Sequence, residues 1–330
     1  MNTLRLVEKS EPIAAGKKDY INKLHASEPK HGYHMVDFIS DMVRRKLNRM
    51  GGSYKTNYDT LIYHLNKFSD INDVVLFTNS INEAFLDDFI GYLQDENLRL
   101  NYIKNLLILV KSTVKKAAIY GYAVDPTYED VDVTQEETFS VYLSMNEITR
   151  IYYYKGLTKR QEMIRDLFII GCLTGLRFSD YSTLTPDNFQ GDEIIKITKK
   201  TNKKVIIPIH DYVREIYNKY GNKIPNNFCI QHFNRYIQMI CQKIGLNEKI
   251  TFSYTKGGRL VTDTKEKWQL IASHTARRSA ATNMYLTGRW QTFQIMSITG
   301  HTTEESFFRY IKVTKTDVAR QMSGDSFFRK

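Results

Sequence analysis

The sequence predicts a two-domain protein that is mainly α-helical and contains a small β-sheet. Apolar residues repeat at helical spacing from about residue 34 to residue 122, and two further helical patterns lie between residues 144 and 174. Between residues 193 and 209 the pattern alternates, which is typical of a β-hairpin. The 330 residues are enough for two domains, each with its own core.

The N-terminal domain, residues 31–124, is expected to contain four helices. Their predicted spans are about 34–50, 53–69, 81–93 and 101–120. Gly51 and Gly52 end the first helix, and Ser53 suits the N-cap position of the second. Residues 1–30 are polar and indicate an N-terminal arm.

A row of lysines marks one face of the fourth helix. Lys104, Lys111 and Lys115 fall within about 40° of one another when each residue turns the helix by about 100°. Alone, such a row indicates a solvated surface. In a basic four-helix module joined to the C-terminal motifs described below, contact with a DNA backbone becomes the stronger interpretation.

Residues 125–138 are acidic and lack an apolar period, so they predict an interdomain linker. The second domain, residues 139–313, begins with a capping box formed by Ser144 and Glu147. Its next helix, residues 161–174, is apolar on most sides and is expected to be the central buried helix. Gly175 ends that helix and Arg177 follows. A charge there needs a partner, which is either Asp180 or an anion from outside.

Two hairpins are predicted in the second domain. The first, residues 193–209, has a basic tip that contains Lys199, Lys200, Lys203 and Lys204. The second, residues 251–267, turns at Gly257 and Gly258. It either completes a small sheet or covers DNA.

The segment from Ser273 to Val313 gathers residues that can bind and attack a phosphodiester. His274 and Arg277 are three residues apart on a predicted helix, so they share a face. His301 begins a turn into a short helix that Thr302 or Thr303 could cap, and that helix is expected to carry Tyr310.

Three segments together resemble the signature boxes of the tyrosine site-specific recombinases, or phage integrase family. They are TGLRFSDYSTL around Arg177, HTARRSAATNM from His274, and TGHTTEESFFRYI ending near Tyr310. Their order and separations are those of the family. The resemblance implies an N-terminal four-helix SAM-like core-binding domain and a mixed α/β catalytic domain.

The resemblance also implies a set of catalytic roles. Tyr310 would attack phosphorus to give a 3′-phosphotyrosine, Arg177 and Arg277 would bind nonbridging oxygens, and Asp180 would hold Arg177. His301 would donate a hydrogen bond to the phosphate, and His274 would give acid/base support. A hairpin lysine would protonate the leaving oxygen. Lys200 is the chosen candidate, and Lys199, Lys203 and Lys204 are close rivals. Lys199 and Lys203 are also expected DNA contacts. No metal, cofactor or ATP is expected.

Composition agrees with a nucleic-acid partner in the cytoplasm. Lysine and arginine outnumber acidic residues 47 to 36, which gives a net charge of +11 and a pI near 9.3. The three cysteines lie apart in the sequence, which indicates reduced thiols rather than disulfides or a metal site. No signal peptide or membrane span is apparent. The expected location is the bacterial nucleoid.

Three functions remain open at this point. The first is a recombinase that acts as a homo-tetramer on double-stranded DNA, is a monomer when free, and works with or without an accessory DNA-bending protein. Integration, inversion and resolution are not separated. The second is a type IB topoisomerase, and the third a DNA-binding protein that has lost catalysis. Residues 314–330 carry apolar side chains that should be buried. They pack either on their own catalytic domain or, as the resemblance implies, on a neighbouring subunit.

Overall fold

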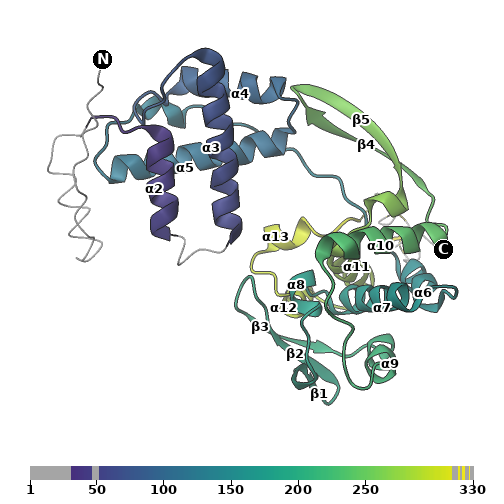
Figure 1. Ribbon diagram of the computed structural model, residues 1–330. Helices are drawn as coiled ribbons and strands as arrows, with labels where there is room; N and C mark the ends of the chain where they lie inside the picture. Colours follow the sequence, from purple (N-terminus) through teal and green to yellow (C-terminus); the bar gives the residue numbers. More distant parts are fainter. Residues whose placement is uncertain (1–30, 47–51, 314–318, 320–321, 324–326, 328–330) are drawn as a thin grey trace. The chain divides into compact units, whose positions relative to one another are not determined.

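The computed structural model describes residues 31–46, 52–313, 319, 322–323 and 327, and it divides the chain into two compact units. The first unit comprises the chain up to Thr138 together with residues 253–261, and the second comprises the remainder from Phe139. Both are built mostly of helices with a little sheet, so the predicted mainly α fold class is confirmed (Figure 1). None of the described helices is both long and apolar enough to cross a membrane. The predicted arm, residues 1–30, and most of the predicted tail lie outside the described residues.

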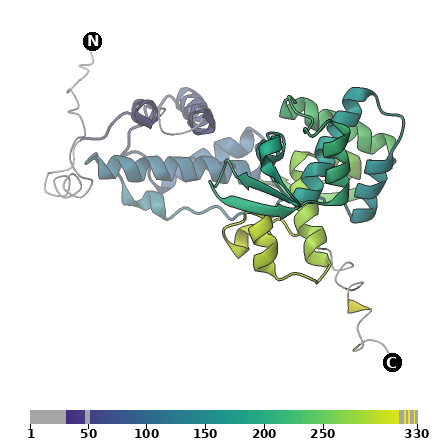
Figure 2. The ribbon, with the colours of Figure 1, turned by 90° about the horizontal axis from the view of Figure 1, so that it is seen from below.

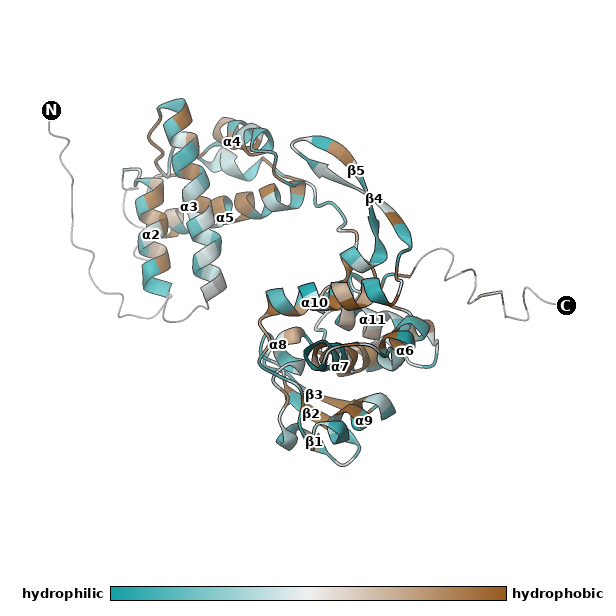
Figure 3. Cartoon of the chain, turned by 45° about the vertical axis from the view of Figure 1, so that its right-hand side comes forward, coloured by the Kyte–Doolittle hydropathy of each residue, from teal (hydrophilic) through white to brown (hydrophobic). Residues whose placement is uncertain are grey.

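In the described part of the first unit, four helices form the core. They are α2 (Met35–Lys46), α3 (Gly52–Asn72), α4 (Glu83–Asp95) and α5 (Leu100–Ile119). Their apolar faces meet in one core, and the hydrophobic residues of α5 are brown in Figure 3. Helix α3 already begins at Gly52, so Ser53 lies inside its first turn and the N-cap prediction for Ser53 is wrong. Asn82 caps α4 by accepting a hydrogen bond from the backbone N–H of Phe85 at 2.9 Å.

The acidic segment after α5 is part of the first unit rather than a bare linker. It forms the 3-10 turn η1 (Pro126–Glu129), and the side chains of Tyr128 and Val131 are buried in the core of that unit. Lys111 of α5 donates hydrogen bonds to the backbone carbonyls of Glu129, at 3.1 Å, and Val131. The acidic segment is therefore anchored to the first unit by these contacts, which its sequence did not indicate.

The second unit is organised around one buried helix, α7 (Lys159–Thr174). The other helices are α6 (Met145–Tyr153), α8 (Phe178–Tyr181), α9 (Asp211–Lys219), α10 (Ile230–Lys243), α11 (Ser273–Leu286), α12 (Thr292–Thr299) and α13 (Glu304–Phe308), with 3-10 turns η2 (Pro186–Asn188) and η3 (Lys267–Leu270). Helices α6, α9, α10 and α11 all pack on α7. The capping box of Ser144 and Glu147 at the start of α6 is confirmed.

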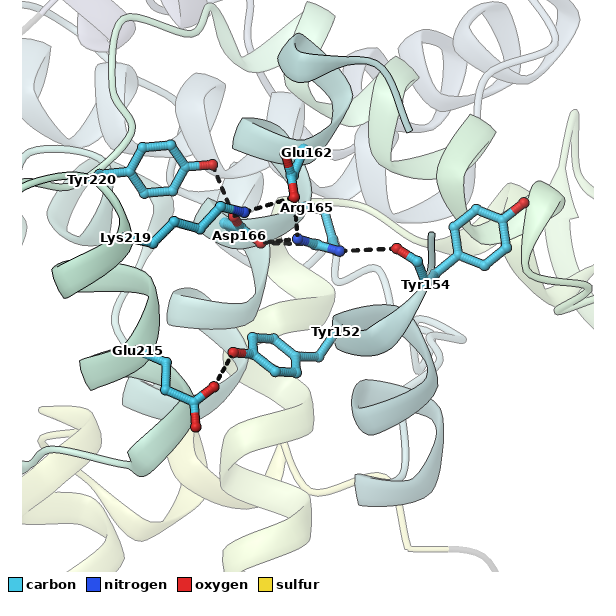
Figure 4. Close-up of polar contacts among 8 residues, drawn as sticks. All are labelled: Tyr152, Tyr154, Glu162, Arg165, Asp166, Glu215, Lys219 and Tyr220. Atoms are coloured by element: carbon cyan, nitrogen blue, oxygen red, sulfur yellow. Dashed lines mark hydrogen bonds and ion pairs between the residues drawn. The ribbon is translucent and has the colours of Figure 1, made fainter. Parts of the chain in front are cut away.

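Helix α7 is less apolar than its sequence indicated, because it buries an ion pair. Arg165 and Asp166 are both buried, and the Nε of Arg165 lies 2.7 Å from Asp166 Oδ1. Lys219 and Tyr220, from the end of α9, each donate to the other carboxylate oxygen of Asp166 at 2.8 Å (Figure 4). The charges are mutually satisfied, so the network fixes α9 against α7.

The first predicted hairpin is confirmed and belongs to a three-stranded antiparallel sheet. Its strands are β1 (Phe189–Gln190), β2 (Glu193–Ile197) and β3 (Lys204–Pro208), in that order. Ile194 and Ile207 are buried partners across β2 and β3. Strand β3 packs on α12 (Figure 2). The sheet thereby holds the 198–203 turn next to the helices that carry the C-terminal motif.

The second hairpin forms a two-stranded sheet of its own, β4 (Lys249–Lys256) and β5 (Arg259–Glu266), and does not complete the other sheet. Its tip belongs to the first unit. The Arg99 guanidinium lies 4.1 Å from the centre of the Tyr254 ring, and the N–H of Gly257 donates to the Leu98 carbonyl at 3.0 Å. Gly257 has a φ of 56°, a left-handed conformation that favours glycine at this turn.

Candidate active site

Arg277 is the centre of the site and is almost completely buried on α11. One terminal nitrogen of its guanidinium donates to the backbone carbonyl of Gly175, at 2.8 Å, and to that of Thr299. These carbonyls stand at the C-terminal ends of α7 and α12. A cation is favoured at such ends because the helix dipole and unpaired carbonyls present negative charge. Arg277 therefore ties three helices together at one point.

Two glycines let the helices end close to this guanidinium. Gly175 and Gly300 cap α7 and α12 with φ values of 68° and 70°, in the left-handed region. A Cβ on Gly175 would lie 3.0 Å from the Cγ2 atom of Thr299. A larger residue there would strain the turn and push apart the two carbonyls that hold Arg277.

His301 is held by Arg277 on one side and by Thr299 on the other. Its Nε2 lies 2.9 Å from a terminal nitrogen of Arg277, and its Nδ1 lies 2.7 Å from Thr299 Oγ1. Burial, with the charges of Arg277 and Arg177, lowers the pKa of His301 to about 3. The imidazole is therefore neutral at physiological pH.

Tyr310 lies against this pair, directly after α13. Its ring centre is 4.8 Å from that of His301, and the central carbon of the Arg277 guanidinium is 5.3 Å from the Tyr310 ring centre. Helix α13 ends at Phe308, so the expectation that the helix itself carries Tyr310 is wrong. Thr303 caps α13, as one of the two predicted caps. Thr282 of α11 donates to the Tyr310 carbonyl at 3.3 Å, which places the turn beside α11.

Arg177 stands at the N-cap of the short helix α8 and is partly buried. One of its terminal nitrogens, and the Nε of Arg277, are buried and have no hydrogen-bond partner among the described residues. A buried unpartnered N–H of a charged group is costly unless something accepts from it. Two such groups in one site favour an anion with several oxygens.

Asp180 does not pair with Arg177 in the part of the chain that the structure describes. Instead, its Oδ1 accepts a hydrogen bond from the backbone N–H of Lys199 at 2.8 Å. The contact expected between Asp180 and Arg177 is therefore not seen among the described residues, and Asp180 binds the backbone of Lys199 instead. Asp180 anchors the hairpin turn beside the site.

The hairpin turn carries exposed lysines, and its backbone is anchored at the site by Asp180. Lys199, Lys200 and Lys203 are all exposed. His274 lies in the first turn of α11, and its pKa is lowered by partial burial and then by the charges of Arg278, Arg277, Arg177 and Lys200. The charge of Lys200 thus reaches His274, and the lowered pKa leaves that imidazole neutral.

The electrostatic balance of the site is positive. Burial first, and then the charge of Arg177, lower the pKa of Arg277 to about 10. Burial also lowers the pKa of Arg278, whose guanidinium donates to the Val141 carbonyl at 2.9 Å. Cations that repel one another around a tyrosine are stabilised by a bound anion.

The lysines of α5 lie in the first unit, whereas the cluster around Arg277 lies in the second. Lys104 is partly exposed and Lys115 is exposed. The Lys111 ammonium is engaged by the carbonyls of Glu129 and Val131, which does not favour a direct phosphate contact from Lys111.

Two residues of the site escaped the sequence analysis. Thr299 holds both Arg277 and His301, and Arg278 adds a second, partly buried cation on α11. The only sequence signal for Thr299 was its place directly before Gly300-His301, and Arg278 followed Arg277 directly. No group of three or more metal-ligating side chains occurs among the described residues.

Family models match both parts of the chain. The phage integrase family matches residues 142–317, and the phage integrase SAM-like domain matches residues 34–135. No curated protein sequence matches the chain.

Solved structures share the fold at low sequence identity. A lambda integrase dimer bound to a COC′ core site has a TM-score of 0.65 and 14% identity, over 84% of this chain and 95% of that one. The Tn1549 transposon integrase in complex with circular intermediate DNA has a TM-score of 0.62 and 14% identity, over 91% of this chain and 100% of that one. A lambda integrase tetramer bound to a Holliday junction has a TM-score of 0.60 and 14% identity, over 90% of this chain and 83% of that one.

Proposed function

Because this chain belongs to the phage integrase family of tyrosine recombinases, we propose that it cleaves and rejoins DNA at a specific site through a 3′-phosphotyrosine. The observation that carries the proposal is the pair of buried, unpartnered N–H groups on Arg177 and Arg277, with the Arg277 guanidinium beside the ring of Tyr310. They fit the nonbridging oxygens of a phosphodiester, and the tyrosine lies where it can attack.

The proposed reaction conserves the energy of the phosphodiester. The Tyr310 hydroxyl oxygen bonds to phosphorus, the bond to the 5′ oxygen breaks, and that oxygen takes a proton. Attack by a 5′ hydroxyl on the phosphotyrosine reverses each change and releases the tyrosine. Each direction forms one phosphorus–oxygen bond and breaks one, so the reaction needs no ATP. We propose that it also needs no metal.

The proposed roles follow from charge. Arg177 and Arg277 stabilise the negative charge that builds on the phosphate oxygens in the transition state. His274, whose pKa is lowered, is neutral and can accept the tyrosine proton. His301 binds a nonbridging oxygen, and Lys200 protonates the leaving 5′ oxygen.

DNA contact by the first unit is also a proposal. We assign the core-binding domain to residues 31–124, the connecting segment to residues 125–138 and the catalytic domain to residues 139–313. Lys104 and Lys115 of α5 would meet the DNA backbone, and neutralising phosphates makes binding salt-dependent. We therefore propose that the protein acts at the bacterial nucleoid.

We further propose that four copies act together on two duplexes and that the free chain is a monomer. The lambda integrase tetramer on a Holliday junction, which shares the fold, supports this assembly. The second unit has an apolar pocket of about 390 Å³, lined in part by Leu173, Met284 and Trp290. The occupant we assign to it is the apolar tail, residues 314–330, of a neighbouring copy.

A chain truncated after Thr314 is expected to bind a single half-site normally but to lose cooperative binding of the paired site and strand exchange. The apolar tail side chains would no longer gain about 1.5–3 kcal/mol each from burial in the partner's pocket. Gel-shift titration measures the cooperativity. Trp290→Ser should reproduce the truncation, whereas Val75→Ser, an exposed change in the first unit, should not. Unchanged cooperativity in the truncated chain would mean that the tail packs on its own copy.

Lys200→Ala is expected to slow cleavage by about a hundredfold or more, because the 5′ oxygen leaves poorly without a proton. On a substrate with a sulfur in the 5′ bridging position, the variant should regain most of the wild-type rate, since a thiolate leaves unprotonated. Cleavage rates on both substrates measure this. Rescue of Lys199→Ala or Lys203→Ala in place of Lys200→Ala would move the role along the hairpin.

The proposal as a whole is tested by trapping. DNA covalently bound to the protein in its native cell is recovered and sequenced. One recurring sequence joined through its 3′ phosphate to Tyr310 is the expected result. Adducts scattered without sequence preference, with relaxation of supercoils by a monomer, would indicate a topoisomerase instead.

A further inference from the structure

Thr299 contacts both Arg277 and His301. Its side chain is completely buried at the end of α12. Its Oγ1 lies 2.7 Å from Nδ1 of His301 and 2.8 Å from the carbonyl oxygen of Ile295, one turn earlier. Its own carbonyl accepts from Arg277.

The donors in this chain of contacts can be assigned from chemistry. A guanidinium can only donate, so Nε2 of His301 must accept from Arg277 and carries no proton. The proton of the neutral ring is then on Nδ1, which donates to Thr299 Oγ1. The carbonyl of Ile295 can only accept, so it takes the Thr299 hydroxyl proton. The direction of the hydrogen bond is fixed at Arg277 and at the Ile295 carbonyl, and the tautomer of His301 between them follows.

This tautomer is the opposite of the one that a phosphate oxygen requires. A nonbridging oxygen has only lone pairs, so Nε2 of His301 must carry a proton to bind it. For the ring to stay neutral, Nδ1 must lose its proton to solvent as Nε2 gains one, and Nδ1 must then accept a hydrogen bond. A hydroxyl can satisfy both states, because it rotates from the Ile295 carbonyl toward Nδ1 without moving its oxygen.

We propose that Thr299 is a positioning residue that sets the tautomer of His301 together with Arg277, accepting from Nδ1–H in the free protein and donating to Nδ1 when phosphate binds. The free-state half rests on the contacts alone. The phosphate-bound half rests on the proposed function.

The free-state half is tested by nitrogen NMR on full-length protein labelled with ¹⁵N-histidine, with the His301 signals assigned from His301→Gln. Wild type and Thr299→Ser should show a protonated Nδ1 and a bare Nε2. Thr299→Val, which keeps the shape and the backbone carbonyl but has no hydroxyl, should weaken this preference, because the buried Nδ1–H loses its acceptor and only Arg277 still favours a bare Nε2. Thr113→Val removes an equally buried hydroxyl that donates to the Leu109 carbonyl at 2.7 Å in the first unit, and should leave His301 unchanged. A bare Nδ1 in wild type, or an unchanged Thr299→Val spectrum, overturns the proposal.

The phosphate-bound half is tested by single-turnover cleavage of the trapped DNA site. Thr299→Val should cleave about tenfold to a hundredfold more slowly at unchanged DNA affinity, a smaller loss than the hundred- to thousandfold typical of removing a direct donor. Thr299→Ser should restore the rate. A normal rate in Thr299→Val overturns this half. Absence of any adduct in wild type refutes the proposed function instead, while the NMR result on the free protein stands.

Discussion

Tyr310→Phe is expected to abolish covalent attachment to DNA, a loss of about a thousandfold or more, while DNA affinity stays within about twofold of wild type. Phenylalanine keeps the ring that packs beside His301 and below Arg277, so only the nucleophilic oxygen is removed. The measurement uses a nicked suicide substrate, on which cleavage releases a short fragment and leaves the protein attached. Denaturing gels then show the adduct, and gel shifts give the affinity.

The matched control is Tyr285→Phe. Tyr285 lies in the same small cluster, with its ring centre 6.4 Å from that of Phe307, but it has no proposed chemical role. This variant should form the adduct at nearly the wild-type rate. An adduct that persists in Tyr310→Phe, or that disappears in Tyr285→Phe, would assign the nucleophile to another residue.

Local signals in the sequence predicted most helices within a few residues. The capping box of Ser144 and Glu147 needs only neighbours three apart, and Gly175 ends α7 because a left-handed residue is required there. The alternation of apolar and polar residues located the β2–β3 hairpin in a similar way, because alternation also depends only on near neighbours in the sequence. These features are decided within one or two turns of chain, so they can be read from the sequence.

The errors concern contacts between distant segments. Residues 125–138 look like a linker by charge, yet Tyr128 and Val131 reach a core formed by helices earlier in the chain. In the sequence Lys111 looks equivalent to Lys104 and Lys115. In the structure, however, its ammonium donates to the backbone carbonyl of Val131. Nothing in a short window reveals either contact.

The site was predicted in part because its chemistry needs particular residue types. His301, Arg277 and Tyr310 were selected by spacing and resemblance, and the structure brings them within contact of one another. Asp180 was selected correctly as a neighbour of the site but with the wrong partner, since its contact with Lys199 joins two segments 19 residues apart. Thr299 was missed because its role depends on where two helix ends meet.

Arg277→Lys is expected to have the second large effect, on stability and on catalysis together. The planar guanidinium reaches Gly175 O, Thr299 O and His301 Nε2 at once, and a single ammonium cannot match that geometry. Each buried acceptor left without its donor costs about 1–3 kcal/mol, so the free energy of unfolding should fall by a few kcal/mol. Chemical denaturation of the free protein measures it.

Catalysis should fall by about a hundredfold to a thousandfold in the same variant, because a donor to the phosphate in the transition state is lost. Single-turnover cleavage, at a temperature where the variant is fully folded, separates this loss from unfolding. Arg278→Lys is the control: its guanidinium makes one described hydrogen bond, to the Val141 carbonyl, so a lysine can replace it with smaller losses in both measurements. If Arg277→Lys lost stability but cleaved at the wild-type rate, Arg277 would be a clamp between helix ends, and the phosphate would be bound by Arg177 without it.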